Sequence, residues 1–265
     1  MGLFFDRSMA KTALITGASL GIGYELAKLF ARDKHALVLV ARSGDKLQKI
    51  AEELKQLGSP QVTVIAKDLA ELEAPDEIFA ETEGRKLQID FLVNNAGFGE
   101  RGPFLKTNLD NELEMVQVNI VALMHLTKLY LPGMVQRRFG RILQVASTAA
   151  FQPGPFMAVY YATKAFVLSF SEALWEELDG TGVTVTALCP GATETGFASR
   201  AGMLNSKLFK MRVMDVKPVV DDGYRAMMKG QSLVVTGLRN RLMAFSIRFA
   251  PRSVVRKVVR RIQEH

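Results

Sequence analysis

The chain has 265 residues, 48% of them hydrophobic, so it is long enough to bury one large core and we expect a single domain over residues 1–265. No run approaches the roughly 18 apolar residues of a membrane span, and the first residues lack the apolar region of a signal peptide, which favours a cytoplasmic protein. A lone cysteine excludes an internal disulfide, three scattered histidines predict no metal site, and the formal net charge of +7 is confined to residues 239–265.

Apolar runs alternate with amphipathic segments along the chain. Strands are predicted at 12–16, 36–41, 62–66, 89–94, 141–147, 183–189 and 233–236, and helices at 22–32, 45–57, 76–86, 110–131 and 159–178. The run 36–41 is apolar throughout, which is typical of a strand buried on both faces. This alternation predicts an α/β fold, a doubly wound Rossmann-type parallel sheet of about seven strands with helices on both faces.

The first strand leads into a glycine-rich turn that opens a helix. Gly17 permits a tight turn, Gly21 lets the backbone approach a ligand, and Gly23 lets the helix sit close to the strand. Unsatisfied N–H groups at the helix start attract a diphosphate, so we expect a dinucleotide here. The spacing Gly-x-x-x-Gly-x-Gly differs from the general fingerprint, and incidental glycines in an ordinary turn are the alternative.

In a sheet of this kind, residues just after the strands line one crevice. Those positions are Gly17–Gly23, Arg42, Asp68, Asn94–Gly97, Ser147 and Pro190–Thr195. An arginine after the second strand suits a 2′-phosphate, so Arg42 favours NADP(H) over NAD(H). The alternative is that Arg42 is a solvated loop charge.

Two side chains with proton chemistry stand one helical turn apart. Tyr160 and Lys164 share a helix face, and an ammonium beside a phenol helps it to exchange a proton near pH 7. Ser147 follows a strand and is able to hold a reacting oxygen beside Tyr160. Taken singly, each residue has an ordinary explanation as a helix neighbour or a turn residue.

As a set, these motifs resemble the short-chain dehydrogenase/reductase family. The chain matches its Thr-Gly-x-x-x-Gly-x-Gly turn at Thr16–Gly23, its adenine-contacting pair at Asp68-Leu69, its Asn-Asn-Ala-Gly segment at Asn94–Gly97 and its nicotinamide segment at Pro190–Thr195. Asn119, Ser147, Tyr160 and Lys164 fall in the order of the family's catalytic tetrad. With the positions after the strands, this gives as cofactor contacts Gly17, Ser19, Leu20, Gly21, Ile22, Gly23, Arg42, Ser43, Asp68, Leu69, Asn95, Ala96, Gly97, Tyr160, Lys164, Pro190, Gly191, Thr193 and Thr195. Leu20 departs from NADP-using relatives that carry a basic residue there.

The resemblance implies an oxidoreductase that transfers hydride between a nicotinamide and a carbonyl or alcohol carbon, in a homodimer or homotetramer. Tyr160 would be the general acid or base, Lys164 would lower the pKa of Tyr160 and bind the nicotinamide ribose, Ser147 would orient the substrate oxygen, and Asn119 would order a water in a proton path. The alternative function is an NADP(H)-binding sensor or scaffold without turnover.

Aromatic residues flank the predicted crevice and favour a lipophilic ketone, aldehyde or secondary alcohol, such as a fatty-acyl or steroid-like compound. The predicted pocket residues are Phe98, Phe151, Phe156 and Phe197, beside Met157, and a segment near 193–216 is expected to cover the substrate. Each aromatic residue is alternatively part of the core.

The tail 239–265 holds eight of the 34 basic residues and one of the 27 acidic ones, so the other 238 residues carry 26 of each. Val254, Val255, Val258, Val259 and Ile262 recur at helical spacing opposite Arg256, Lys257, Arg260 and Arg261, which predicts a basic amphipathic helix. Its apolar face packs on the domain or a partner subunit, or alternatively docks on anionic lipid. No nucleic-acid motif accompanies the charge, and no nucleic-acid partner is expected.

Overall fold

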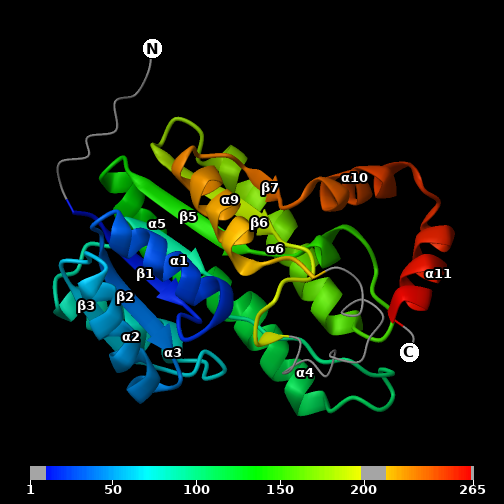
Figure 1. Ribbon diagram of the computed structural model, residues 1–265, viewed down its shortest axis with the longest axis horizontal. Helices are drawn as coiled ribbons and strands as arrows, with labels where there is room; N and C mark the ends of the chain where they lie inside the picture. Colours follow the sequence, from blue (N-terminus) through cyan, green and yellow to red (C-terminus); the bar gives the residue numbers. More distant parts are fainter. Residues whose placement is uncertain (1–9, 198–212, 264–265) are drawn as a thin grey trace.

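The computed structural model describes residues 10–197 and 213–263, and a parallel seven-stranded sheet forms its centre (Figure 1). The strands are β1 (Thr12–Thr16), β2 (Ala36–Ala41), β3 (Val62–Ala66), β4 (Phe91–Asn94), β5 (Gly140–Val145), β6 (Val183–Cys189) and β7 (Leu233–Val235). Their order across the sheet is β3-β2-β1-β4-β5-β6-β7. The predicted Rossmann-type sheet is therefore confirmed, with its switch point between β1 and β4.

Helices cover both faces of the sheet. They are α1 (Gly21–Arg32), α2 (Gly44–Gln56), α3 (Ala74–Gly84), α4 (Leu109–Val116), α5 (Leu123–Gln136), α6 (Ala158–Glu177), α9 (Val216–Met228), α10 (Leu238–Ser246) and α11 (Arg252–Gln263). Shorter turns are the π-helical η1 (Gln117–Ala122) and the 3-10 helices η2 (Thr148–Phe151) and η3 (Ile247–Phe249). One core layer packs α1, α2 and α9 on the sheet, and the opposite layer packs α3, α5 and α6.

The central strands explain why the sequence reads as continuous apolar runs. In β2, Val38 and Val40 belong to one core layer, whereas Leu37 and Leu39 belong to the other. Successive side chains of a strand point to opposite faces, and here both faces are covered by helices. Every position in the middle of the strand is therefore buried and apolar.

The helix predicted at 110–131 is wrong at its end. The chain stays helical from α4 through the π-helical turn η1 to the end of α5, past Pro132. A proline leaves the carbonyl four residues earlier without its helical partner, and here Pro132 and Lys128 both lie exposed, on the side of the helix that faces solvent. By length and composition this combined helix, Leu109–Gln136, is apolar enough to cross a membrane, but 44% of its most apolar window is buried inside the protein.

Two predicted strand boundaries also shift. β4 begins at Phe91 instead of residue 89, and the carboxylate of Asp90, just before it, accepts a hydrogen bond from the Thr12 amide (3.1 Å). β5 ends at Val145, two residues before the predicted end. Ser147 therefore stands in the turn that follows the strand.

The basic tail forms α10, η3 and α11 at one end of the molecule (Figure 1). The predicted amphipathic helix is present as α11, which packs on the core through Val255 and Val259. The expected apolar stripe is divided, however, because Val254 and Val258 are exposed. The last two residues of the predicted tail lie outside the described part of the chain.

Candidate functional site

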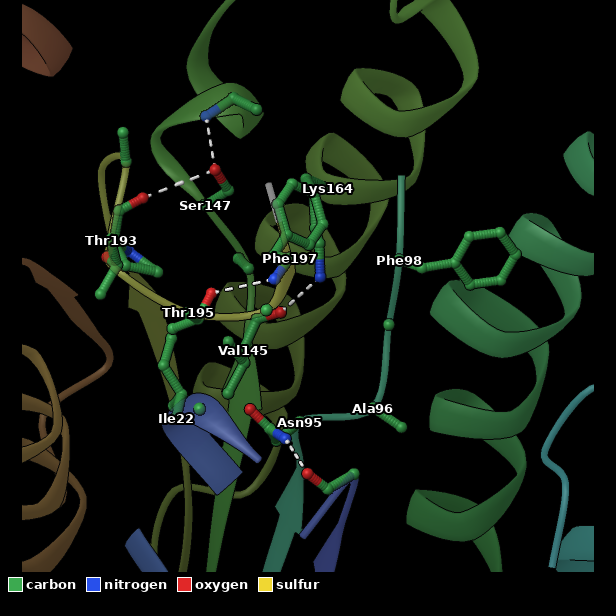
Figure 2. A pocket seen from close by; sticks show the side chains of 18 of the residues that line it. Ile22, Asn95, Ala96, Phe98, Val145, Ser147, Lys164, Thr193, Thr195 and Phe197 are labelled. Carbon is green, nitrogen blue, oxygen red and sulfur yellow. Dashed lines mark hydrogen bonds between the residues drawn. The ribbon is translucent and has the colours of Figure 1, made fainter. Parts of the chain in front are cut away.

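A cavity of about 1210 Å³ opens at the carboxyl ends of the strands. Figure 2 shows side chains from the strand ends, the glycine turn and α6 gathered around it. Every predicted cofactor contact except Gly23 lines the cavity. The residues after the strands do form one crevice, as the fold class implied.

The glycine turn has the backbone that only glycine adopts easily. Gly17 and Gly21 have φ of +64° and +58°, in the left-handed region. A Cβ on Gly23 would lie 2.4 Å from Asn95 Nδ2 and 2.5 Å from the Gly17 carbonyl oxygen. Gly23 therefore allows α1 to approach the turn closely but does not line the cavity.

Asn95 holds this turn in place. Its side-chain amide donates hydrogen bonds to the carbonyl oxygens of Thr16 (2.9 Å) and Gly17 (3.2 Å). In return, the Thr16 hydroxyl accepts from the amides of Asn95 and Ala96, both at 3.0 Å. Asn95 borders the cavity, but its side chain positions the turn.

The residue that precedes α1 leaves the N-terminus of this helix uncapped. Leu20 occupies the N-cap position in an extended conformation and has no side-chain oxygen with which to cap the first N–H groups. An uncapped helix start next to a cavity is a site for an anion. The geometry fits the diphosphate of a dinucleotide.

Basic side chains stand at the opposite side of the cavity from the catalytic candidates, after β2 and β3. Arg42 Nη1 lies 3.6 Å from Asp68 Oδ2, and more than half of the Arg42 side chain is exposed. Lys46, one turn into α2, and Lys67 line the same part of the cavity. Ser43 precedes α2 without capping it through its side chain. Lys46 and Lys67 were missed, although Lys46 follows Arg42 by four residues and Lys67 directly precedes Asp68.

The structure brings Ser147, Tyr160 and Lys164 to the cavity wall. Ser147 Oγ accepts a hydrogen bond from the Ala149 amide (3.1 Å), so the residue also caps η2. Lys164 Nζ donates to the Val145 carbonyl oxygen (2.8 Å) and lies 5.9 Å from the centre of the Tyr160 ring. The ammonium is thus held beside the ring by the end of β5.

Burial dominates the protonation of both groups. It raises the pKa of the Tyr160 phenol above its ordinary value, and a hydrogen bond with Ser147 acts in the opposite direction. Burial also lowers the pKa of the Lys164 ammonium to about 8. At neutral pH Tyr160 therefore holds its proton and Lys164 is mostly charged.

Asn119 lies behind the cavity wall. It sits in the π-helical turn η1 and is buried, and its side-chain amide donates to the Phe98 carbonyl oxygen (2.9 Å) and to Thr163 Oγ1 (3.0 Å). Its Oδ1 accepts from the Phe98 amide at 3.1 Å. The side chain therefore fastens the loop after β4 to α6, next to Lys164.

Two of the four predicted pocket residues, Phe98 and Phe197, line the cavity. Phe197 lines the cavity, and its ring centre lies 5.2 Å from that of Tyr160. Phe98 borders the cavity, but its ring points away from Lys164 (Figure 2). Phe151 packs instead against the apolar cluster between α6 and β6, and Phe156 lies under Arg260 of α11, 5.8 Å from its guanidinium. Neither Phe151 nor Phe156 lines this cavity.

Other apolar residues take their place at the substrate end. They are Val213, Met214, Met243, Val259 and Ile262. Three of the five come from α10 and α11, which sequence reasoning treated as a tail because nothing in the pattern links them to the strand ends. Most of the segment predicted to cover the substrate, residues 198–212, lies outside the described chain.

The loop after β6 closes against the glycine turn. A Cβ on Gly21 would lie 3.1 Å from Thr195 Cβ, and one on Gly191 would lie 2.4 Å from Asn240 Nδ2. Thr193 Oγ1 donates to the Gly191 carbonyl oxygen (2.9 Å). Pro190, Thr193 and Thr195 thus border the cavity between the glycine turn and the wall formed by Ser147, Tyr160 and Lys164.

Comparisons with known proteins agree with this arrangement. The sequence model described as short chain dehydrogenase matches residues 11–203. The human very-long-chain 3-oxoacyl-CoA reductase is 33% identical over 251 residues, which cover 93% of this chain and 75% of that protein.

Solved structures are similar over most of both chains. A short-chain dehydrogenase from Sphingobium yanoikuyae in complex with NADPH matches with a TM-score of 0.81 and 33% identity, covering 89% of this chain and 92% of that chain. The bulky-bulky ketone specific alcohol dehydrogenase from Comamonas testosteroni matches with a TM-score of 0.77 and 31% identity, covering 90% and 92%. The chain belongs to the short-chain dehydrogenase family and is an oxidoreductase.

Proposed function

We propose that this oxidoreductase uses NADP(H) to reduce a lipophilic carbonyl compound, or to oxidise the matching secondary alcohol, with Tyr160 as the general acid or base. The observation on which this depends is the shared cavity, which has an open helix start at one end and Ser147, Tyr160 and Lys164 at the other. A nucleotide that reaches from one to the other brings its reactive ring to the phenol.

The residues present fit the cofactor. The left-handed glycines Gly17 and Gly21 clear space over the start of α1, and Leu20 leaves its N–H groups free for a diphosphate. Arg42 and Lys46 line the cavity beyond the end of β2 and would hold a 2′-phosphate there, which supports NADP(H) over NAD(H). When bound, the nicotinamide supplies hydride to the carbonyl carbon.

The chain itself supplies the proton. Ser147 orients the carbonyl oxygen, and Tyr160 donates its phenolic proton to that oxygen as the carbon is reduced, so that the product is the alcohol. The Lys164 ammonium, held at the end of β5, stabilises the phenolate that remains. In the reverse direction the phenolate accepts the proton.

The walls of the substrate end support a lipophilic substrate. Phe197, Met214, Met243, Val259 and Ile262 are apolar and face the cavity. Relatives named for very-long-chain 3-oxoacyl-CoA and for bulky ketones favour a large carbonyl compound. Long-chain 3-oxoacyl thioesters and bulky ketones are therefore the first substrates to test.

Substitution of Tyr160 tests the proposal. Tyr160→Phe is expected to lower kcat by about 100- to 10,000-fold, because it removes the proton donor, while NADPH binding stays nearly intact. The assay follows nicotinamide absorbance with a panel of carbonyl compounds, and fluorescence titration measures NADPH binding. Tyr130→Phe, which alters another buried phenol away from the cavity, is the control and should keep full activity.

Comparable activity in Tyr160→Phe would disprove the assigned role. If the unmodified chain binds NADPH but oxidises it with no member of the panel, the sensor becomes the better proposal. A panel in which small polar carbonyls react faster than lipophilic ones would contradict the substrate class.

A further inference from the structure

The C-terminal arm, defined here as residues 238–263 with α10, η3 and α11, has an outer surface that the reaction does not use. Its inner side packs on the rest of the protein through Ala244, Val255, Val259 and Gln263, which are buried. In Figure 1 the arm lies at one end of the molecule, beyond the substrate end of the sheet. The outer side combines exposed apolar side chains with a dense set of cations.

A stripe of large apolar side chains runs along the outer side of α10 and η3. Leu242, Phe245 and Phe249 follow one another at intervals of three and four residues, which places them on one helix face. Their exposed fractions are 61%, 60% and 74%, and Leu238, which is 72% exposed at the start of α10, also borders the cavity. The ring centres of Phe245 and Phe249 lie 5.2 Å apart, and Val254 and Val258 on α11 are exposed as well. Large apolar side chains gathered on a surface mark an interaction site.

Cations surround this stripe. All eight basic residues of the arm are exposed, and Arg239 among them also lines the cavity; they are Arg239, Arg241, Arg248, Arg252, Arg256, Lys257, Arg260 and Arg261. No acidic residue occurs between positions 238 and 263, and residues before the arm are neutral in sum. The partner must therefore offer negative charge together with an apolar layer.

We propose that the C-terminal arm docks on the surface of an anionic lipid bilayer. Phosphate groups at the bilayer surface meet the arginines, and the leucine and phenylalanine side chains enter the boundary of the acyl chains about 5–10 Å deep. Nucleic acid matches the charge but gives no apolar layer for aliphatic side chains such as Leu242 and Val254. The bilayer interface provides both negative charge and an apolar layer, because its headgroups lie directly above the acyl chains.

The arm is firmly anchored, so docking fixes how the cavity faces the membrane. Gln263 Nε2 donates to the Tyr161 hydroxyl (2.8 Å), and the Gln263 carbonyl oxygen accepts from Arg101. Met243 and Ile262 line the cavity from the inner side of the same two helices whose outer side bears the apolar stripe. If the proposed function holds, the membrane also stores the lipophilic substrate next to the cavity.

Flotation of the full-length chain with vesicles tests the proposal. Vesicles of phosphatidylcholine with phosphatidylglycerol should carry the protein upward, whereas pure phosphatidylcholine should not, and raising salt from about 0.1 M to about 1 M should weaken the binding. Phe245→Ser/Phe249→Ser should weaken binding by about tenfold or more. Arg248→Gln/Arg252→Gln/Arg256→Gln should weaken it by about a hundredfold.

Matched control variants test whether the location of the substituted side chains matters, or only the loss of apolar or charged side chains. Leu72→Ser/Leu105→Ser removes two exposed apolar side chains elsewhere, and Lys49→Gln/Lys128→Gln/Lys229→Gln removes three exposed charges elsewhere. Both should bind as the unmodified chain does. None of the substituted residues lines the cavity, so turnover of a water-soluble carbonyl should be unchanged in every variant.

Failure to bind anionic vesicles would overturn the proposal, and so would equal losses in the control variants or equal binding to neutral vesicles. Preferred binding to DNA or RNA in a gel-shift assay would assign the surface to nucleic acid. A dimer that dissociates in Phe245→Ser/Phe249→Ser, without vesicle binding, would assign it to a second copy. Binding is measured without turnover, so these outcomes are independent of the proposed reaction.

Discussion

At the scale of single residues, the cavity holds two proton-bearing groups that burial shifts in opposite directions. The pKa of Tyr160 is raised by burial and that of Lys164 is lowered to about 8. Sequence reasoning expected Lys164 to lower the pKa of the phenol. In this structure Lys164 instead binds the Val145 carbonyl, and Tyr160 keeps its proton, which suits a donor in carbonyl reduction.

The lowered pKa of Lys164 predicts that activity is lost at alkaline pH. The kcat/KM for NADPH reports groups on the free enzyme and should fall as pH rises through about 8, because Lys164 then loses its charge. Lys164→Arg should move this limit to higher pH, and Lys164→Met should remove it and leave low activity at every pH. Pre-steady-state or initial-rate pH profiles measure this, and an unchanged limit in Lys164→Met would assign the titration to another group.

The same shift has a consequence for stability. The pKa of Lys164 is lower in the folded chain than the ordinary 10.5, so between about 8 and 10.5 the unfolded chain binds more protons. The free energy of unfolding contributed by Lys164 therefore rises with pH in that window. Below pH 8 the buried charge costs stability at a constant level.

Arg42 predicts cofactor preference. Arg42→Gln should raise KM for NADPH by about 10- to 100-fold and leave KM for NADH nearly unchanged, because only the 2′-phosphate is lost as a partner. Steady-state kinetics with both cofactors measure the ratio. Lys11→Gln, which removes a charge away from the cavity, should leave the ratio unchanged, and an equal effect on both cofactors would contradict the assignment.

At the scale of elements, α1 begins without a cap, and this leaves its first N–H groups for a ligand. Leu20→Asn should raise the free energy of unfolding without ligand by about 1 kcal/mol, since the new side-chain oxygen caps the helix. It should also weaken NADPH binding, because that oxygen occupies amides at Ile22 or Gly23. Thermal unfolding and NADPH titration measure both effects.

Leu20→Ala is the matched variant, because it also removes the leucine but adds no oxygen. It should not gain stability, and its affinity for NADPH should stay near that of the unmodified chain. Tighter NADPH binding in Leu20→Asn would show that the amides at the start of α1 do not hold the cofactor.

The elements were predictable where one rule decided them. The strands that are buried on both faces are recognisable in the sequence as apolar runs. The glycine turn is recognisable because its backbone requires positive φ. The end of α5 was not predictable from the sequence. Whether Pro132 breaks the helix depends on the solvent exposure of Lys128, whose carbonyl loses its helical partner, and that exposure is a tertiary property. The π-helical turn at Asn119 left no sequence signal that we recognise.

At the scale of the whole molecule, the site unites residues from both ends of the chain. The pairing of Gln263 with Tyr161 joins α11 to α6 beside Tyr160. Sequence reasoning found Ser147, Tyr160 and Lys164 through local spacing, but it missed Met243, Val259 and Ile262, whose place depends on how the arm folds back. For the same reason it assigned the pocket to Phe151 and Phe156, which lie close to Ser147 and Tyr160 in sequence but do not line the cavity.

This pairing predicts local opening of the arm. Gln263→Ala leaves the buried Tyr161 hydroxyl without its partner and should weaken the docking of α11 by about 1–3 kcal/mol. Hydrogen exchange should accelerate in residues 252–263, and KM for the carbonyl substrate should rise while the Kd of NADPH holds. In a double-mutant cycle, Tyr161→Phe should add little to Gln263→Ala, and full additivity would show that the two side chains act independently.

The strand order has a consequence for how the protein is made. After β1, every strand joins an open edge: β2 beside β1, β3 beside β2, β4 on the free side of β1, and then β5, β6 and β7 outward in turn. No later strand has to be inserted between two that already pair. A ribosome that releases this chain from its N-terminus therefore delivers the strands in an order in which each can be added as it emerges, and the glycine turn and Asn95, which holds it, are both available once residue 97 has left the tunnel.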